Sequence, residues 1–246
     1  MRPFAILQVR PEDRASDDEF DAILAKGRLD ASEVARFRLD REPLPRPFDV
    51  GAFAGIVVGG GPGCFSDHPE EKSDVEQEME ARVLAIMPEV IVEDAPFLGC
   101  CYGLGALATA LGGDVSQERF GEPVGPVTCS FTADASEDPL CAGLPPTFDA
   151  FVGHKEAVQR LPKGCAHLAA APTCPMQMIR YGKNVYATQF HPEADAAVFE
   201  TRIRLYRNNG YFPPDEADAL IARCKAADVT VPPELLARFV ARYRAH

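Results

Sequence analysis

The chain has 246 residues, of which 46% are hydrophobic and 25% charged, and its formal net charge is −12. This length and hydrophobic content suffice to bury one sizeable core. We therefore expect a single domain over residues 1–246, with a C-terminal helical extension, residues 195–246, packed on it. The net negative charge and the lack of a basic cluster argue against nucleic acid and anionic membrane surfaces as partners.

The N-terminal apolar run is too short for the core of a signal peptide, and no run approaches the length of a membrane span. The eight cysteines are irregularly spaced, without CxxC pairs and without the spacing of a zinc site. We therefore expect reduced thiols in a cytoplasmic protein, and no metal site.

Strands and helices alternate along the first half of the chain. Apolar or alternating runs predict strands at residues 4–9, 35–39 and 53–58, and helical spacing of apolar residues predicts helices at 17–26 and 74–93. Because Pro88 lies inside the last of these, we expect two helical segments joined there. The alternation predicts a parallel sheet covered on both faces.

A glycine-rich loop at residues 59–63 follows the third predicted strand. A phosphate cradle would need a helix opening at its last glycine, but another loop follows, which argues against a nucleotide fingerprint. The preferred interpretation is a loop whose backbone N–H groups point into the crevice above the strand ends. A plain glycine turn is the structural alternative.

Residues 96–107 read as a short buried strand that turns abruptly into a helix, with a cysteine at the corner. A nucleophile elbow needs small residues two positions before and after the nucleophile. Gly99 and Gly103 satisfy this rule for Cys101, whereas bulky residues would flank Cys100. We expect the helix N-terminus to lower the pKa of the Cys101 thiol. Alternatively, the two cysteines are small buried hydrophobic residues.

The pattern changes after this helix, which we expect at residues 102–111. Strand-like pieces at 124–131, 148–153, 165–171, 177–181 and 185–190 are separated by turns. The last two form a hairpin around residues 182–184, so this part of the sheet should be partly antiparallel. Helices are predicted at 138–142 (a short one), 197–207, 214–226 and 233–245.

His191 and Glu193 follow the last predicted strand, separated by Pro192. Pro192 favours an extended backbone at His191, and residues two apart in an extended segment face the same way. A carboxylate on one imidazole nitrogen fixes the tautomer and leaves the other nitrogen as a base. Alone, His191 could be an ordinary loop histidine. Together with Cys101 it offers a nucleophile, a base and an orienting carboxylate at strand ends.

Three segments in this order resemble the motifs of class I glutamine amidotransferases, most of all the amidotransferase domain of GMP synthase and its free-standing relatives. They are residues 58–63 (VGGGPG), 96–103 (PFLGCCYG) and 185–193 (VYATQFHPE). The resemblance covers roughly residues 4–194. It implies a flavodoxin-like, three-layer α/β/α sandwich with a mixed, mostly parallel sheet.

The resemblance also implies roles for individual residues. The catalytic triad would be Cys101, His191 and Glu193. The oxyanion hole would be formed by the backbone N–H groups of Gly61 and Tyr102. Substrate contacts would fall on Gly60, Gly153 and His154. Neither a metal nor an organic cofactor is implied.

Gly105 departs from the family pattern, which often has glutamine four residues after the nucleophile to help seat the substrate. The sequence also contains no synthase domain. Three functions are therefore weighed. The first is hydrolysis of the glutamine side-chain amide, releasing ammonia for an unidentified acceptor or a synthase partner subunit. The second is hydrolysis of γ-glutamyl amides or peptides by the same triad. The third is a non-catalytic partner protein that retains the fold.

Overall fold

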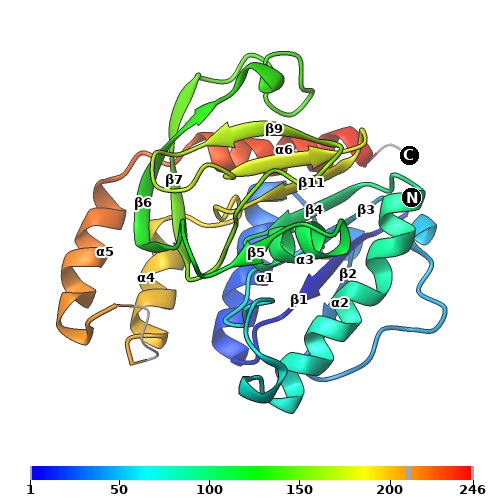
Figure 1. Cartoon of the computed structure of the whole chain (residues 1–246), viewed down its shortest axis with the longest axis horizontal. Coiled ribbons are helices and arrows are strands. Elements are labelled where there is room, and N and C mark those ends of the chain that lie inside the picture. The colour runs from blue at the N-terminus through cyan, green and yellow to red at the C-terminus, as the bar shows by residue number, and fades with distance from the viewer. Residues whose placement is uncertain (1, 209–211, 245–246) are drawn as a thin grey trace.

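The computed structural model describes residues 2–208 and 212–244. In this part of the chain a nine-stranded sheet has the order β2-β1-β3-β4-β11-β10-β9-β6-β7, with helices on both faces (Figure 1). Its strands are β1 (Phe4–Gln8), β2 (Val34–Arg38), β3 (Gly55–Val58), β4 (Phe97–Cys100), β6 (Glu122–Phe131), β7 (Thr147–His154), β9 (Cys165–Ala170), β10 (Met178–Tyr181) and β11 (Val185–Thr188).

The sheet changes direction at β11. Strands β2, β1, β3, β4 and β11 are parallel neighbours, and from β11 onward each neighbouring pair is antiparallel. The predicted α/β fold with a mixed sheet and the predicted hairpin between β10 and β11 are therefore confirmed. Strands β4 and β11, which are far apart in the sequence, pair with one another at the centre of the sheet.

Alternation along the central strands produces two cores. Phe4 and Ile6 of β1 belong to one apolar cluster, whereas Ala5 and Leu7 belong to the other. Helices α1 (Asp13–Gly27) and α6 (Val231–Tyr243) contribute to the first cluster, and α2 (Asp74–Val92) and α3 (Tyr102–Ala110) to the second. Because side chains alternate along a strand, successive residues point to the helical layers on opposite faces of the sheet.

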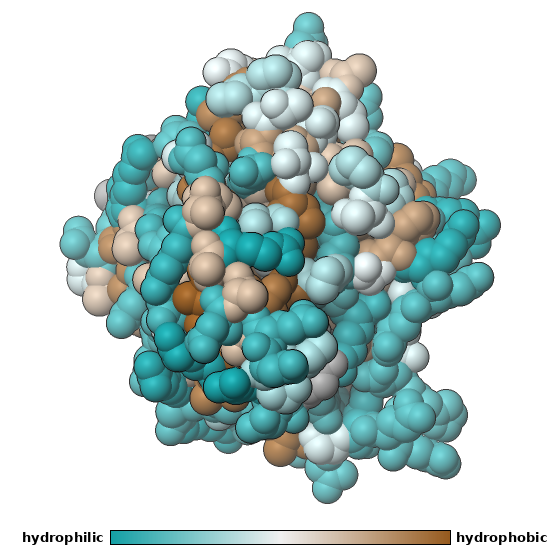
Figure 2. Space-filling view, turned by 90° about the vertical axis from the view of Figure 1, so that its left-hand side faces the viewer, coloured by the Kyte–Doolittle hydropathy of each residue, from teal (hydrophilic) through white to brown (hydrophobic). Residues whose placement is uncertain are grey.

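Two further helices cover the side of the molecule next to β6 and β7. Helices α4 (Ala196–Leu205) and α5 (Ala217–Ala226) pack apolar side chains around Phe151 of β7 in a third cluster. Figure 2 shows this side, where the surface is mostly hydrophilic and hydrophobic residues gather towards the middle. The predicted C-terminal helices are confirmed, although residue 245 of the last one lies outside the described residues.

Pro88 does not break its helix, so the prediction of two segments is wrong: α2 runs without interruption from Asp74 to Val92. A proline in a helix removes one hydrogen bond at a cost of about 3 kcal/mol. Val83, Ile86, Met87 and Val90 are all at most 4% exposed on both sides of Pro88. Their burial against the sheet outweighs that cost.

The short helix predicted at 138–142 is also wrong. The Asp138 carboxylate accepts from the N–H of Leu140, and the N–H groups of Cys141 and Ala142 bond back to the carbonyl of Asp138. The segment is thus a turn anchored by an aspartate, and it ends at Gly143 with φ of 76°. The nearby short helix is a 3-10 turn at Ala133–Ala135.

The remaining elements are small. A two-stranded sheet pairs β5 (Val115–Ser116) with β8 (Ala157–Val158), too short to be read from the sequence. Further 3-10 turns lie at Ala31–Glu33, Val50–Ala52, Pro69–Glu71 and Pro214–Glu216. None of the helices in the described ranges has the length and apolar character needed to cross a membrane.

Candidate active site

Cys101 occupies the corner between β4 and α3. Its backbone has φ of 52° and ψ of −93°, a conformation that is strained for a residue with a side chain. A Cβ at Gly99 would lie 2.5 Å from the carbonyl oxygen of Gly103, so strand and helix approach through two glycines. Cys100 lies in the strand and is 1% exposed. The geometry is that of a nucleophile elbow centred on Cys101.

His191 and Glu193 form a buried pair beside this corner. His191 Nδ1 lies 2.9 Å from Glu193 Oε1, and the two residues are 4% and 0% exposed. Because a carboxylate can only accept, Nδ1 carries the proton and Nε2 keeps its lone pair. Pairing of β4 with β11 sets Thr188 opposite Cys100, which brings the chain after β11 towards the elbow.

Two pockets meet at the elbow, and both are lined by Gly61, Pro62, Cys101 and Gly153. The glycine-loop pocket, about 420 Å³ including its mouth, extends past Gly105, Glu156 and Gln189. The α4 pocket, about 480 Å³ including its mouth, extends past His191, Phe199 and Arg202. Cys101 therefore lies between the two pockets. His191 lines the α4 pocket but not the glycine-loop pocket.

Gln189 lies beside the candidate nucleophile. Its Nε2 lies 3.9 Å from Cys101 Sγ, and no hydrogen bond joins the thiol to His191 among the described residues. Hydrogen bonds between catalytic groups are often long before substrate binds. The sequence analysis did not single out Gln189. The signal was its position two residues before His191, on the same side of an extended segment.

Burial controls the protonation of the site. It raises the pKa of Cys101 to about 12, although the positive charge of Arg10 acts in the opposite direction. Burial also lowers the pKa of His191 below its ordinary 6.5. The resting pair at neutral pH is therefore a thiol and a neutral imidazole. The expected lowering of the thiol pKa by the helix N-terminus is wrong, because desolvation is the larger effect.

An ion-pair network lies behind the histidine. Arg202 Nη2 donates to Glu193 Oε1 at 2.8 Å and lies 3.7 Å from Glu19 Oε1, while Arg10 Nε donates to Glu19 at 2.9 Å. Burial opposes ionisation of Glu193, but His191 and Arg202 together hold its pKa well below the usual 4.5. The sequence analysis missed Arg10, Glu19 and Arg202, because their pairing depends on contacts between distant segments.

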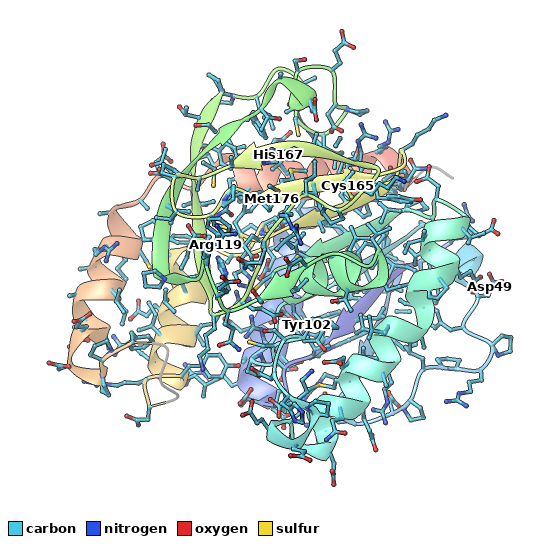
Figure 3. The ribbon with its side chains drawn as sticks, in the orientation of Figure 1. Asp49, Tyr102, Arg119, Cys165, His167 and Met176 are labelled. Atoms are coloured by element: carbon cyan, nitrogen blue, oxygen red, sulfur yellow. The ribbon has the colours of Figure 1, made fainter. Side chains whose placement is uncertain are left out.

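The glycine loop contacts the other side of the histidine. A Cβ at Gly60 would lie 2.5 Å from His191 Cε1, so only glycine leaves room for the imidazole there. The Gly60 N–H donates to Glu19 at 3.2 Å, and Gly60 lines neither pocket. Gly61 lines both pockets, and Tyr102 begins α3 beside the glycine-loop pocket (Figure 3). As the first residue of the helix, Tyr102 has an N–H without a helical acceptor.

Gly105 is enclosed. A Cβ at this position would lie 2.8 Å from the Phe65 ring and 3.1 Å from Glu156 Oε1. Glu156 in turn accepts hydrogen bonds from the N–H groups of Phe65 and Ser66 and from the Ser66 hydroxyl. The volume that a longer side chain at 105 would need is therefore filled by an aromatic ring and a carboxylate.

Gly153 and His154, the two predicted substrate contacts on β7, have different surroundings. Gly153 lines both pockets. The His154 ring is engaged with Glu122 Oε2 at 2.9 Å and the Glu156 carbonyl at 2.7 Å. Glu122, His154 and Cys174 have ligand atoms close enough to hold a metal ion. Gln177 and Thr173 also donate to the Glu122 carboxylate, so this group already forms a hydrogen-bonded network.

Comparisons with known proteins bear on the family and the fold of the chain. A family model described as glutamine amidotransferase class-I matches residues 28–205. A GMP synthase [glutamine-hydrolyzing] from Thermosipho melanesiensis is 36% identical over 122 residues, which cover 48% of this chain and 22% of that protein. The corresponding protein from Thermosipho africanus is 32% identical over 155 residues, covering 61% and 26%. The chain thus spans about a quarter of the length of these relatives.

Solved structures match the whole fold. A glutamine amidotransferase from Thermotoga maritima has a TM-score of 0.75 at 20% identity, covering 99% of this chain and 98% of that one. A glutamine amido transferase from Methylobacillus flagellatus has a TM-score of 0.68 at 20% identity, covering 100% and 95%. Both support the α/β/α arrangement.

Proposed function

The chain belongs to the class-I glutamine amidotransferase family, and from this premise we propose that it hydrolyses the side-chain amide of glutamine through a γ-glutamyl thioester on Cys101. The observation that carries the proposal is the His191–Glu193 pair at 2.9 Å, whose imidazole lines a pocket together with a strained cysteine at a strand–helix corner. A nucleophile, a base and an orienting carboxylate are the parts that acyl transfer needs.

In the proposed mechanism, neutral His191 takes the thiol proton as Sγ attacks the amide carbon. The backbone N–H groups of Gly61 and Tyr102 receive the oxyanion, a contribution of about 3 kcal/mol per donor in comparable enzymes. His191 then gives its proton to the leaving nitrogen, the C–N bond breaks, and ammonia departs. Water activated by His191 hydrolyses the thioester to glutamate. Glu193 stabilises the imidazolium in both halves of the reaction.

The glycine-loop pocket suits the amino-acid head of the substrate. Lys155 and Glu156, of opposite charge, both line it. The α-carboxylate and α-ammonium of glutamine carry the complementary charges. We assign Glu156 to the ammonium, and Gly153 and the backbone of His154 to the rest of the head group. Gly60, by contrast, is assigned to the packing of His191.

We propose that a partner protein binds the acceptor of the ammonia. The GMP synthases similar to this chain are about four times as long as the matched part, so a separate synthase subunit is the proposed consumer. We place the protein in the cytoplasm, in keeping with its eight free cysteines.

The test is release of glutamate and ammonia from glutamine by the isolated protein. Cys101→Ala should abolish turnover, and Cys100→Ala, the matched change one residue away, should retain it. Loss of activity in Cys100→Ala alone would contradict the assignment. Absence of turnover in the natural protein, together with failure of Cys101 to react with an electrophilic glutamine analogue, would favour the non-catalytic alternative.

Hydrolysis of larger γ-glutamyl amides is the second candidate. The enclosed position of Gly105 favours it, because the site does not use the glutamine side chain with which many relatives seat free glutamine.

A further inference from the structure

We propose that the α4 pocket binds the amine half of a γ-glutamyl amide, and that its preferred ligand is an apolar amino acid joined through its amino group, as in a γ-glutamyl dipeptide. This inference rests on the proposed function and names its substrate class.

The α4 pocket lies beside His191, and this position identifies it as the pocket that receives the leaving group. The histidine must reach the leaving nitrogen to protonate it, so the amine half lies on the side of Cys101 that contains the imidazole. His191 lines the α4 pocket and not the glycine-loop pocket. The glutamyl half, which needs the oppositely charged Lys155 and Glu156, therefore takes the other side.

The lining of the α4 pocket is not what ammonia requires. Its wall includes Val124, Phe199, Ile203 and Phe212. Such an apolar wall gains free energy from a hydrocarbon or aromatic side chain and gains nothing from ammonia.

Arg202 adds an unused polar group to this wall. The residue is 6% exposed and lines the pocket, and its Nε and Nη1 have no hydrogen-bond partner among the described residues. Only Nη2 is engaged with Glu193. Buried guanidinium N–H groups are normally paired, and a carboxylate is their preferred partner. The carboxylate of an amino acid leaving group would supply that partner once the guanidinium turns Nε or Nη1, both fully buried here, towards the pocket.

The reaction balances as an ordinary hydrolysis. Cys101 Sγ gives its proton to His191 and bonds to the carbonyl carbon of the γ-carboxamide, the C–N bond breaks, and the amine leaves with the proton from His191. Water then replaces the thiolate, so the products are glutamate and the free amino acid. No oxidant or further reactant is involved.

The test compares γ-glutamyl-L-phenylalanine, γ-glutamyl-L-alanine and γ-glutamylphenethylamine, with glutamine as the reference for the proposed function. We expect kcat/KM for the phenylalanine dipeptide to exceed those for the alanine dipeptide and for the phenethylamide by about tenfold or more. Val124→Phe, which fills the pocket, should bring the phenylalanine-to-alanine ratio towards one. Val229→Phe is the matched control, because Val229 packs on the same apolar cluster without lining the pocket, and it should leave the ratio unchanged.

Equal rates for the two dipeptides, beside measurable glutamine turnover, would overturn this inference and leave the proposed function standing. Absence of turnover with every substrate would count against the proposed function. In that case calorimetric binding of the two dipeptides to Cys101→Ala decides the inference separately: tighter binding of the phenylalanine dipeptide supports the pocket, and equal or absent binding overturns it.

Discussion

His191 and Arg202 bind the same oxygen of Glu193, at 2.9 and 2.8 Å. The carboxylate is thus fixed by a cation while it orients the imidazole. Arg202 in this role is a positioning residue, since it acts on the reaction through Glu193. Its positive charge also contributes to the lowering of the His191 pKa.

Replacement of Arg202 should therefore change both stability and pH dependence. Arg202→Gln leaves the buried Glu193 carboxylate without its cation, and we expect a loss of about 3 to 5 kcal/mol in the free energy of unfolding. Since the pKa of His191 rises when that charge is removed, the acid limb of kcat should move to higher pH, and kcat should fall about tenfold. Urea unfolding and a pH–rate profile measure the two effects.

Arg204→Gln is the matched control for this change. Arg204 pairs with Glu200 one turn away on the same helix, and its side chain is 55% exposed. Exposed pairs contribute little, so the urea midpoint and the pH profile should stay as in the natural protein. An unchanged acid limb in Arg202→Gln would contradict the positioning role.

The elbow should not tolerate a methyl group at Gly99. In Gly99→Ala the new Cβ would lie 2.5 Å from the Gly103 carbonyl, and backbone cannot move aside cheaply. We expect loss of glutaminase activity and a lower thermal midpoint. Gly112→Ala provides the comparison: its φ of 71° costs about 1 to 2 kcal/mol, but nothing lies within 4 Å of the added atom. Activity at moderate temperature should survive there, and equal damage in both variants would count against the elbow.

The rate of glutamine hydrolysis should hold to unusually low pH. In the proposed mechanism His191 works as a base in its neutral form, and its pKa lies below 6.5 because of burial. We expect the acid limb of kcat/KM to have its midpoint below pH 6.5. An acid limb centred above that value would show that the histidine is not the buried base described above.

Protein stability should fall over the same acidic range. Unfolding restores the ordinary pKa values, so the unfolded chain binds more protons than the folded chain at both residues. For His191 stability is lost as pH falls below 6.5, and for Glu193 as pH falls from 4.5 towards its low folded value. Thermal unfolding of His191→Ala between pH 7 and 4 should show a weaker decline than the natural protein.

Glu156→Gln should weaken substrate binding more than chemistry. The carboxylate is assigned to the substrate ammonium and lies away from His191, so KM for glutamine should rise about tenfold with a smaller change in kcat. Because Glu156 also holds the loop at Phe65 and Ser66, Glu156→Asp is a useful second variant. Glu118→Gln, at an exposed position, should leave KM unchanged. A pure loss of kcat in Glu156→Gln would contradict the assignment.

The sequence predicted those features that local pattern decides. The apolar run at residues 4–9 predicted the strand, and the two glycines around Cys101 selected the cysteine at the corner. Pro192 and the two-residue spacing placed His191 beside Glu193. Each of these signals spans about five residues. Over so short a segment the backbone geometry alone determines the local structure and which side chains meet.

Features that depend on burial or on distant partners could not be read in advance. The uninterrupted course of α2 through Pro88 requires the sheet beneath it, and the high pKa of Cys101 requires the burial of the corner. The Arg10–Glu19–Arg202 network joins segments nearly 200 residues apart in sequence. No local pattern marks such partners, since each is an ordinary helix or loop residue by itself.

The parallel pairing of β4 with β11 also fixes when the site can exist during synthesis. Gln189 follows Cys101 by 88 residues, so β4 leaves the ribosome well before its central neighbour. At 5 to 20 residues per second this interval lasts roughly 4 to 18 s. A nascent chain therefore carries its thiol without a base over this interval, and the candidate site is complete only once Glu193 has been made.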